Sequence, residues 1–190
     1  MGNNQVIFKK LTDAALGMGA FKASVISTCN IVTDHIFRDI CLSNSCGMCG
    51  KCYMCPPDVG DIEVLIAEIK NYDYALVYQT VNELEDSFDI EGMREAKKRF
   101  YPISQGLKGV FVDAGIGQVL HLGAGGCGVC SKCAKQTGEP CRFPELAMPS
   151  LEAYGINVSE LAKSAGMKYI NGQDTVTYFG TVLFNTCDGE

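Results

Sequence analysis

The sequence contains no tryptophan, and only six prolines and two histidines occur among its 190 residues. Basic side chains are also few, since 16 Lys and Arg residues face 22 Asp and Glu residues and leave a net charge of −6. This balance argues against nucleic-acid binding, which needs a broad basic surface. Because His35 and His121 are the only histidines, the composition also argues against a histidine-rich zinc site.

Long apolar runs and an export signal are missing as well. No apolar run reaches the roughly 18 residues that a membrane-spanning helix needs. The first 15 residues lack both the basic flank and the apolar stretch of a secretion signal. We therefore expect a cytoplasmic protein that binds neither membranes nor nucleic acids.

Cysteine, by contrast, is abundant. Eleven cysteines are present, an odd number, and nine of them fall in two short runs at residues 41–55 and 127–141. A disulfide framework would spread its cysteines along the chain, whereas crowded cysteines in a protein without an export signal more often bind metal. We expect a single metal-binding domain over residues 1–190 with two cysteine sites.

The hydrophobic periodicity predicts an α+β or α/β fold, in which one layered core of sheet and helices carries the two cysteine-rich loops. Helices are expected at 6–16, after Asp58 or Asp61, at 87–100 with a stop or kink at Pro102, and after Asn157. Strands are expected at 21–27, 74–81, 119–122 and 175–184, the last with a bend at Gly180 as an option. Each half places a cysteine run before a helix and an extended segment, which suggests a loose internal duplication.

The second run has the clearer ligand pattern. Cys127, Cys130 and Cys133 follow one another at intervals of three, and Cys141 comes after seven further residues. This spacing is typical of a [4Fe–4S] cluster, because a tight loop can present one thiolate to each of three irons while a later residue serves the fourth. The glycines at 125, 126 and 128 would let the backbone approach the cluster closely. A four-cysteine zinc site and unligated thiols remain the alternatives.

The first run is denser and its ligand assignment is open. It contains Cys41, Cys46, Cys49, Cys52 and Cys55, and two prolines follow directly. The last four cysteines resemble the bacterial ferredoxin run, with one residue fewer before the Cys-Pro pair. In two-cluster ferredoxins the cysteine of that pair serves the other cluster, so Cys55 need not join its neighbours. Five candidates for four positions leave at least one cysteine spare.

These motifs together resemble a prokaryotic family of predicted metal-binding proteins, domain of unknown function 2284. The resemblance rests on Cys41, Cys46 and Cys55-Pro-Pro, on the second run through Cys141-Arg-Phe-Pro, and on the segment PSLEAYGINV at 149–158. It extends from about Val25 to the end of the chain and implies two cysteine-based metal sites without an established activity. The family's first motif uses only the positions of Cys41, Cys46 and Cys55, so Cys49 and Cys52 depart from it.

Other signals are weaker. Residues 123–128 match the G-x-G-x-x-G fingerprint, but a cysteine interrupts it and we do not expect nucleotide binding. His35 and His121 are expected to be structural, and the isolated Cys29 and Cys187 to be small buried hydrophobes. Basic side chains beside the cysteines would offset a cluster's negative charge, form a docking patch for an acidic partner, or simply be solvated: Lys51, Lys132, Lys135 and Arg142.

We therefore predict a protein with one or two [4Fe–4S] clusters that exchanges single electrons with a redox partner protein. The candidate ligands are Cys41, Cys46, Cys49, Cys52, Cys55, Cys127, Cys130, Cys133 and Cys141. One alternative is an enzyme in which a cluster leaves one iron open to substrate, which a three-cysteine first site would favour. The other is a non-redox module whose zinc sites, each with four cysteines, stabilise the loops.

Overall fold

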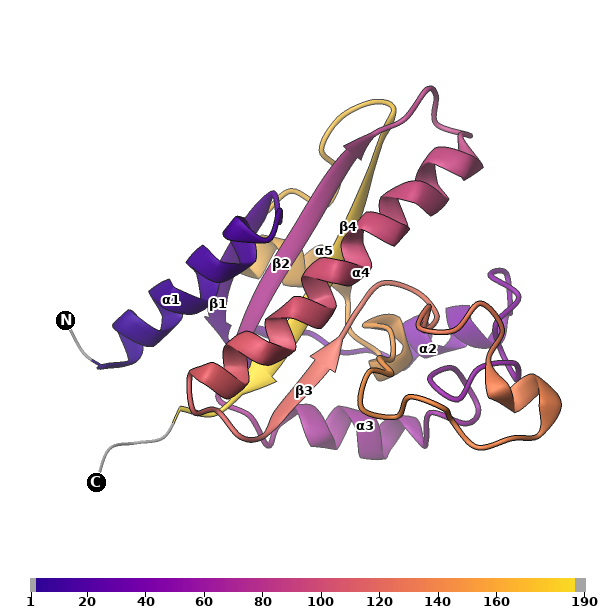
Figure 1. The fold of residues 1–190 in the computed structure, drawn as a ribbon, viewed down its shortest axis with the longest axis horizontal. Helices are drawn as coiled ribbons and strands as arrows, with labels where there is room; N and C mark the ends of the chain where they lie inside the picture. The colour runs from indigo at the N-terminus through magenta and orange to yellow at the C-terminus, as the bar shows by residue number, and fades with distance from the viewer. Residues whose placement is uncertain (1–2, 187–190) are drawn as a thin grey trace.

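Four strands form a single sheet in the order β1-β2-β4-β3 (Figure 1). The computed structural model describes residues 3–186. Its strands are β1 (Lys22–Ser27), β2 (Tyr74–Glu83), β3 (Val119–Leu122) and β4 (Thr175–Phe184), and all three pairings are antiparallel. The predicted α+β class is therefore confirmed, and the parallel sheet of an α/β fold does not apply.

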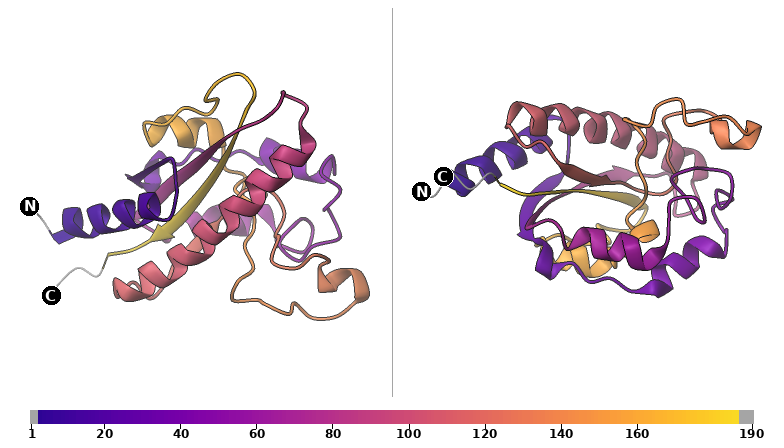
Figure 2. Two further views of the ribbon diagram at one scale, coloured as in Figure 1. Left: turned by 45° about the horizontal axis from the view of Figure 1, so that its top comes forward. Right: turned by 90° about the horizontal axis from the view of Figure 1, so that it is seen from below.

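Helices cover both faces of this sheet, as the right-hand view of Figure 2 shows. On one face lie α1 (Asn3–Gly17) and α4 (Ile90–Asp113), and on the other lie α3 (Ile62–Ile69) and α5 (Val158–Ser164). Successive β2 side chains alternate between the two hydrophobic clusters, so that Leu76 and Tyr78 face α4 while Ala75 and Val77 face α3 and α5. No helix in the described part of the chain has the length and apolar character needed to cross a membrane.

The order of elements repeats along the chain. The first half reads α1, β1, cysteine run, α3, β2, and the second half reads α4, β3, cysteine run, α5, β4. The halves meet where β2 pairs with β4 over ten residues. This repeated order agrees with the arrangement suggested by the sequence. The first half also contains α2 (His35–Leu42), which the hydrophobic pattern does not predict.

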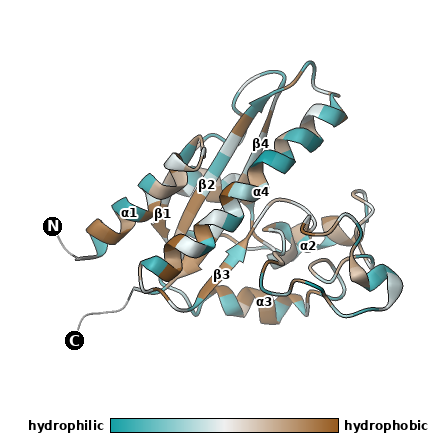
Figure 3. Cartoon of the chain, viewed as in Figure 1, coloured by the Kyte–Doolittle hydropathy of each residue, from teal (hydrophilic) through white to brown (hydrophobic). Residues whose placement is uncertain are grey.

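The helix containing Pro102 does not stop there. Helix α4 is continuous from Ile90 to Asp113, so a helix stop at Pro102, one of the two predicted options, is wrong. Phe100, Leu107 and Phe111 are buried on both sides of the proline. Each such burial contributes about 1.5–3 kcal/mol, and together they outweigh the cost of roughly 3 kcal/mol for an internal proline. Figure 3 shows the mixed hydrophobic and hydrophilic residues of this amphipathic helix.

Gly180 makes room for the Tyr78 side chain and does not interrupt β4. The strand is unbroken, and Gly180 lies directly opposite Tyr78 on β2. A Cβ at position 180 would lie 2.3 Å from the Tyr78 ring, which is fully buried. The Tyr78 hydroxyl in turn donates to Ser104 Oγ at 2.7 Å and lies 2.8 Å from His121 Nε2. The missing side chain therefore makes room for a buried hydrogen-bonded network.

We expect Gly180→Ala to lower the free energy of unfolding by about 1–3 kcal/mol, because the methyl group would displace the Tyr78 ring from a filled core. Gly109→Ala is the matched control, since a Cβ at that α4 position meets no atom within 4 Å and alanine favours helices by up to about 1 kcal/mol. Chemical denaturation of both variants measures the difference. Equal stabilities would contradict the packing role of Gly180.

Candidate metal centre

The cysteines of the first run surround a cavity of about 240 Å³. Cys41 lies in the last turn of α2, and the others lie in the loop that follows. Four thiols line this cavity, and we call them the first set: Cys41, Cys46, Cys49 and Cys55. The Asn44 side chain accepts the backbone N–H of Cys49 at 2.9 Å, so the turn between α2 and Cys49 is fixed locally.

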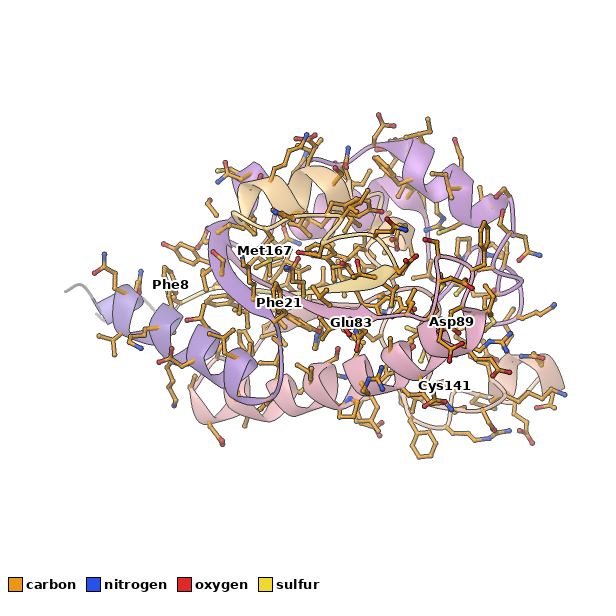
Figure 4. All side chains as sticks on the ribbon, turned by 90° about the horizontal axis from the view of Figure 1, so that it is seen from above. Phe8, Phe21, Glu83, Asp89, Cys141 and Met167 are labelled. Atoms are coloured by element: carbon orange, nitrogen blue, oxygen red, sulfur yellow. The ribbon has the colours of Figure 1, made fainter. Side chains whose placement is uncertain are left out.

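The cysteines of the second run line a smaller cavity of about 20 Å³. We call them the second set: Cys127, Cys130, Cys133 and Cys141. All four are partly buried in the loop after β3, and Cys133 directly precedes the short 3-10 helix Ala134–Thr137. In Figure 4, Cys141 lies at the end of the molecule opposite Phe8 of α1. Across the described residues, no three His, Cys, Asp or Glu side chains converge tightly enough for one metal ion.

Cys52 is the residue of the first run that turns to the second cavity. It is 1% exposed. The interaction with Cys127 lowers the pKa of Cys52, but the interaction with Cys55 and burial raise it, to about 11. The interaction with Cys52 lowers the pKa of Cys55, and Cys55 itself lines the first cavity.

Side-chain contacts hold the two cysteine loops together. Tyr53 from the first loop donates its hydroxyl to the Glu139 carbonyl at 2.8 Å. Lys135 from the second loop pairs with Asp58 and lies 5.5 Å above the centre of the Tyr53 ring. A Cβ on Gly126 would lie 3.4 Å from Cys55 Sγ, so the second loop passes close beside the first set. The loops form one unit, which local spacing alone could not reveal.

Side chains of helix α4 donate hydrogen bonds to the second loop. Tyr101 donates its hydroxyl to the Gly126 carbonyl at 2.7 Å, and Lys97 donates to the same oxygen at 3.2 Å. A Cβ on Gly128 would lie 2.5 Å from the Tyr101 ring, so only glycine allows this approach. Burial lowers the pKa of Lys97, while the nearby Cys46, Cys55 and Cys127 thiolates oppose that shift. The sequence reading missed both residues, because no local motif marks them.

Buried Arg38 fixes the position of α2 and Cys41. Its guanidinium donates to the Ala153 and Gly60 carbonyls, both at 2.7 Å. Burial and then Glu152 raise the pKa of Cys41, and Arg38 partly opposes them. Residues 150–155, which follow the second loop, therefore help to shape the first cavity.

The basic residues beside the cysteines divide into two groups. Arg142 lines the second cavity together with Cys130 and donates to Glu139 at 2.8 Å. Lys135 pairs with Asp58, whereas Lys51 and Lys132 are exposed. Arg142 therefore lies close enough to a second-set thiolate to stabilise its charge, and Lys97 does the same for both sets.

The remaining residues that the sequence analysis singled out either have structural roles or belong to neither cysteine set. His121 is buried beside Tyr78, and burial and Lys108 lower its pKa to about 3. His35 is exposed and lies 3.2 Å from Glu63. Residues 123–128 open no helix that could face a pyrophosphate. Cys29 is exposed, so its expected burial is wrong, and it joins neither set; Cys187 lies outside the described residues.

We expect Lys97→Gln to raise, by on the order of one unit, the pH below which bound metal is released. The ammonium favours the thiolate form of three ligand candidates, and without it protons displace the metal at higher pH. Lys98→Gln is the control, since Lys98 is exposed and pairs with Glu95. Metal retained after dialysis across a pH series measures the shift. Identical release curves for the two variants would contradict this role for Lys97.

Comparison with known proteins places the chain in a family. No curated protein and no solved structure matches it. The family model described as predicted metal-binding protein (DUF2284) matches residues 24–184, which include all nine clustered cysteines. The match covers most of the chain, so this protein belongs to the DUF2284 family of predicted metal-binding proteins.

Proposed function

We propose that this protein binds [4Fe–4S] clusters at its two cysteine sets and exchanges single electrons with a redox partner protein. The observation that carries the proposal is that each of two cavities is lined by at least four cysteines: the first set lines one, and the second set together with Cys52 lines the other. Four thiolates are the complete ligand complement of a cubane cluster. Such a group supplies one-electron chemistry when it is bound, and the protein's part is to hold, shield and tune it.

The shape of the first set supports a cluster rather than a single ion. A zinc ion holds each sulfur at about 2.3 Å, so its four thiolates must lie within roughly 4 Å of one another. In the described residues, however, no three metal-ligating side chains converge on one point, and the cavity that the first-set cysteines help to line measures about 240 Å³. Cys46 is exposed, so this site reaches the surface where a partner protein can exchange electrons.

The arrangement of charges also supports thiolate-bound clusters. Four thiolates give a site a net negative charge, which nearby cations stabilise. Lys97 lies near thiols of both sets, and Arg142 lines the second cavity together with Cys130. Arg142 and Lys135 already pair with acidic side chains. Their position therefore supports a role in offsetting the negative charge of a cluster better than a role as a free basic surface for an acidic partner.

The first set also bears on the enzyme alternative. An open iron position would follow from three cysteine ligands, and Cys49 supplies a fourth thiol to the same cavity. The geometry therefore supports electron transfer over an enzyme with an iron open to substrate.

A zinc ion in the second set is the second candidate. Its cavity of about 20 Å³ has room for about one water-sized sphere. The spacing of the second run favours a cluster, whereas the size of the cavity favours one ion. A zinc ion would require the second-set thiols to close around it, because no three ligating side chains converge on one point in the described residues. Metal analysis distinguishes the two.

Protein made and kept without oxygen should contain about eight irons and eight acid-labile sulfides per chain. The protein should be brown, with an absorption band at about 400 nm that dithionite bleaches. About four irons with one zinc would support the second candidate for the second set. Stoichiometric zinc without iron under these conditions would overturn the proposal, whereas zinc after aerobic preparation would not, because thiolates freed of a damaged cluster bind zinc well.

Replacing one ligand of each set should remove one cluster and leave the other. Cys141→Ser should lower the iron content by about four per chain, because serine is a hard and poorly ionised ligand. Cys46→Ser should remove the other cluster in the same way. Electron paramagnetic resonance of the two reduced variants distinguishes the centres. If both variants lost the same signal, the two sets would share ligands and the division into fours would be wrong.

A further inference from the structure

Strand β3 lies at one edge of the sheet and pairs with β4 alone (Figure 1). Directly after β3, Gly123 bonds with a different segment of the chain. Its N–H donates to the Pro149 carbonyl at 2.9 Å, and its carbonyl accepts the Leu151 N–H at 3.0 Å. These two bonds form an isolated parallel bridge between Gly123 and Ser150. Among the described residues, the sheet therefore extends past β3 at Gly123 but not along β3 itself.

The backbone of β3 repeats the orientation of Gly123 at every second residue. Because the N–H and C=O groups of alternate residues point to the same side of a strand, those of Val119 and His121 face the same side as those of Gly123. Within the described residues, neither Val119 nor His121 makes a backbone hydrogen bond outside the sheet. Unpaired groups of this kind are a template for the addition of another strand.

A groove of about 410 Å³ lies along this side of β3, and we call it the edge groove. Its walls are apolar and come from both faces of the sheet. Phe111 and Val112 of α4 line it from one face, and Val59 and Tyr154 line it from the other. Val112 is 73% exposed, so its side chain is free to contact a ligand. The unpaired backbone therefore lies between two apolar walls.

The edge groove carries little net charge. Two of its lining side chains have opposite charges, Lys108 and Glu145, and the Lys108 ammonium donates to the Glu145 carbonyl at 2.6 Å. His121, which also lines the groove, is uncharged at neutral pH because burial and the nearby Lys108 lower its pKa to about 3. An occupant without net charge therefore fits this groove best, since a charge would lose water without gaining a partner.

We propose that the edge groove binds an extended, uncharged segment of a partner protein, which pairs with β3 as an added strand. The backbone of such a segment would bond with Val119 and His121, while its side chains would contact the apolar walls, as in other cases of strand addition. β-Branched residues suit this role because they favour strands. Met54 and Ala147 line both the edge groove and the second cavity, so the partner would lie beside the second set. The inference does not require that either cavity hold metal.

The test uses a blocked, fluorescein-labelled peptide of alternating valine and threonine. Its binding to the protein prepared without oxygen is measured by fluorescence anisotropy. The comparison peptide has the same sequence with a methyl group on every amide nitrogen, so it keeps the side chains but has no backbone N–H to donate. We expect the first peptide to bind and the methylated peptide to bind at least about tenfold more weakly.

Two pairs of variants test the backbone and the wall separately. Val119→Pro removes an N–H that faces the groove, and proline is tolerated on edge strands, whereas Val119→Ala keeps this N–H. The proline variant should lose about tenfold in affinity and the alanine variant much less. Val112→Gln places an amide on the apolar wall and should lose about fivefold. Val64→Gln is its control, because Val64 is 65% exposed on α3 and does not line the groove.

Several outcomes would overturn the inference. Failure of the peptide to bind, equal binding of the methylated peptide, or equal losses in Val119→Pro and Val119→Ala would each exclude strand addition. Dimerisation of the free protein that Val119→Pro abolishes would make a second copy of the chain the occupant. If Val119→Pro does not fold by circular dichroism, Val112→Gln and the methylated peptide still decide. Absence of iron from the wild-type protein would overturn the proposed function and leave this inference intact.

Discussion

The position of the Gly126–Gly128 backbone between helix α4 and the first cysteine loop is the constraint on which the rest of the centre depends. Lys97 and Tyr101 hold the Gly126 carbonyl from one side, and Cys55 lies against the same residue from the other. A side chain at Gly128 would collide with the Tyr101 ring. The absence of these two side chains brings the two cavities next to each other, and it allows one half-buried lysine to act on thiols of both sets.

Contacts with the second half of the chain position the first set. After β1, the backbone runs beside residues 155–157, where the backbone N–H of Asp34 donates to the Gly155 carbonyl at 2.7 Å and the backbone N–H of Asn157 donates to the Val32 carbonyl at 2.9 Å. Arg38 then fixes α2 against the same region. The first cavity is consequently lined by residues from both halves, including Gly126 and Ser150. Although the order of elements repeats, the two cysteine loops are not independent modules, because each depends on contacts with the other half.

Local sequence patterns predicted the fold well wherever burial follows periodicity. The strands were found near their observed positions, and Asp61 and Asn157 cap α3 and α5. Helix α2 was missed because its Ile36 and Ile40 are exposed, so it shows no apolar face to a core. Its capping aspartate, Asp34, was the available signal. Lys97 and Tyr101 could not be predicted, since they reach the cysteines only through the packing of α4.

The same reasoning explains why spacing located the nine cysteines but did not assign them. Cysteines that are three residues apart point in the same direction only if the backbone between them turns regularly. Gly47 and Gly50 adopt left-handed conformations, with φ of 72° and 70°, and each reverses the local turn between two cysteines. Cys49 therefore returns to the first cavity while Cys52 points to the second. Cys49 thereby adds a fourth cysteine to the lining of the first cavity, whereas Cys52 joins the four cysteines that line the second.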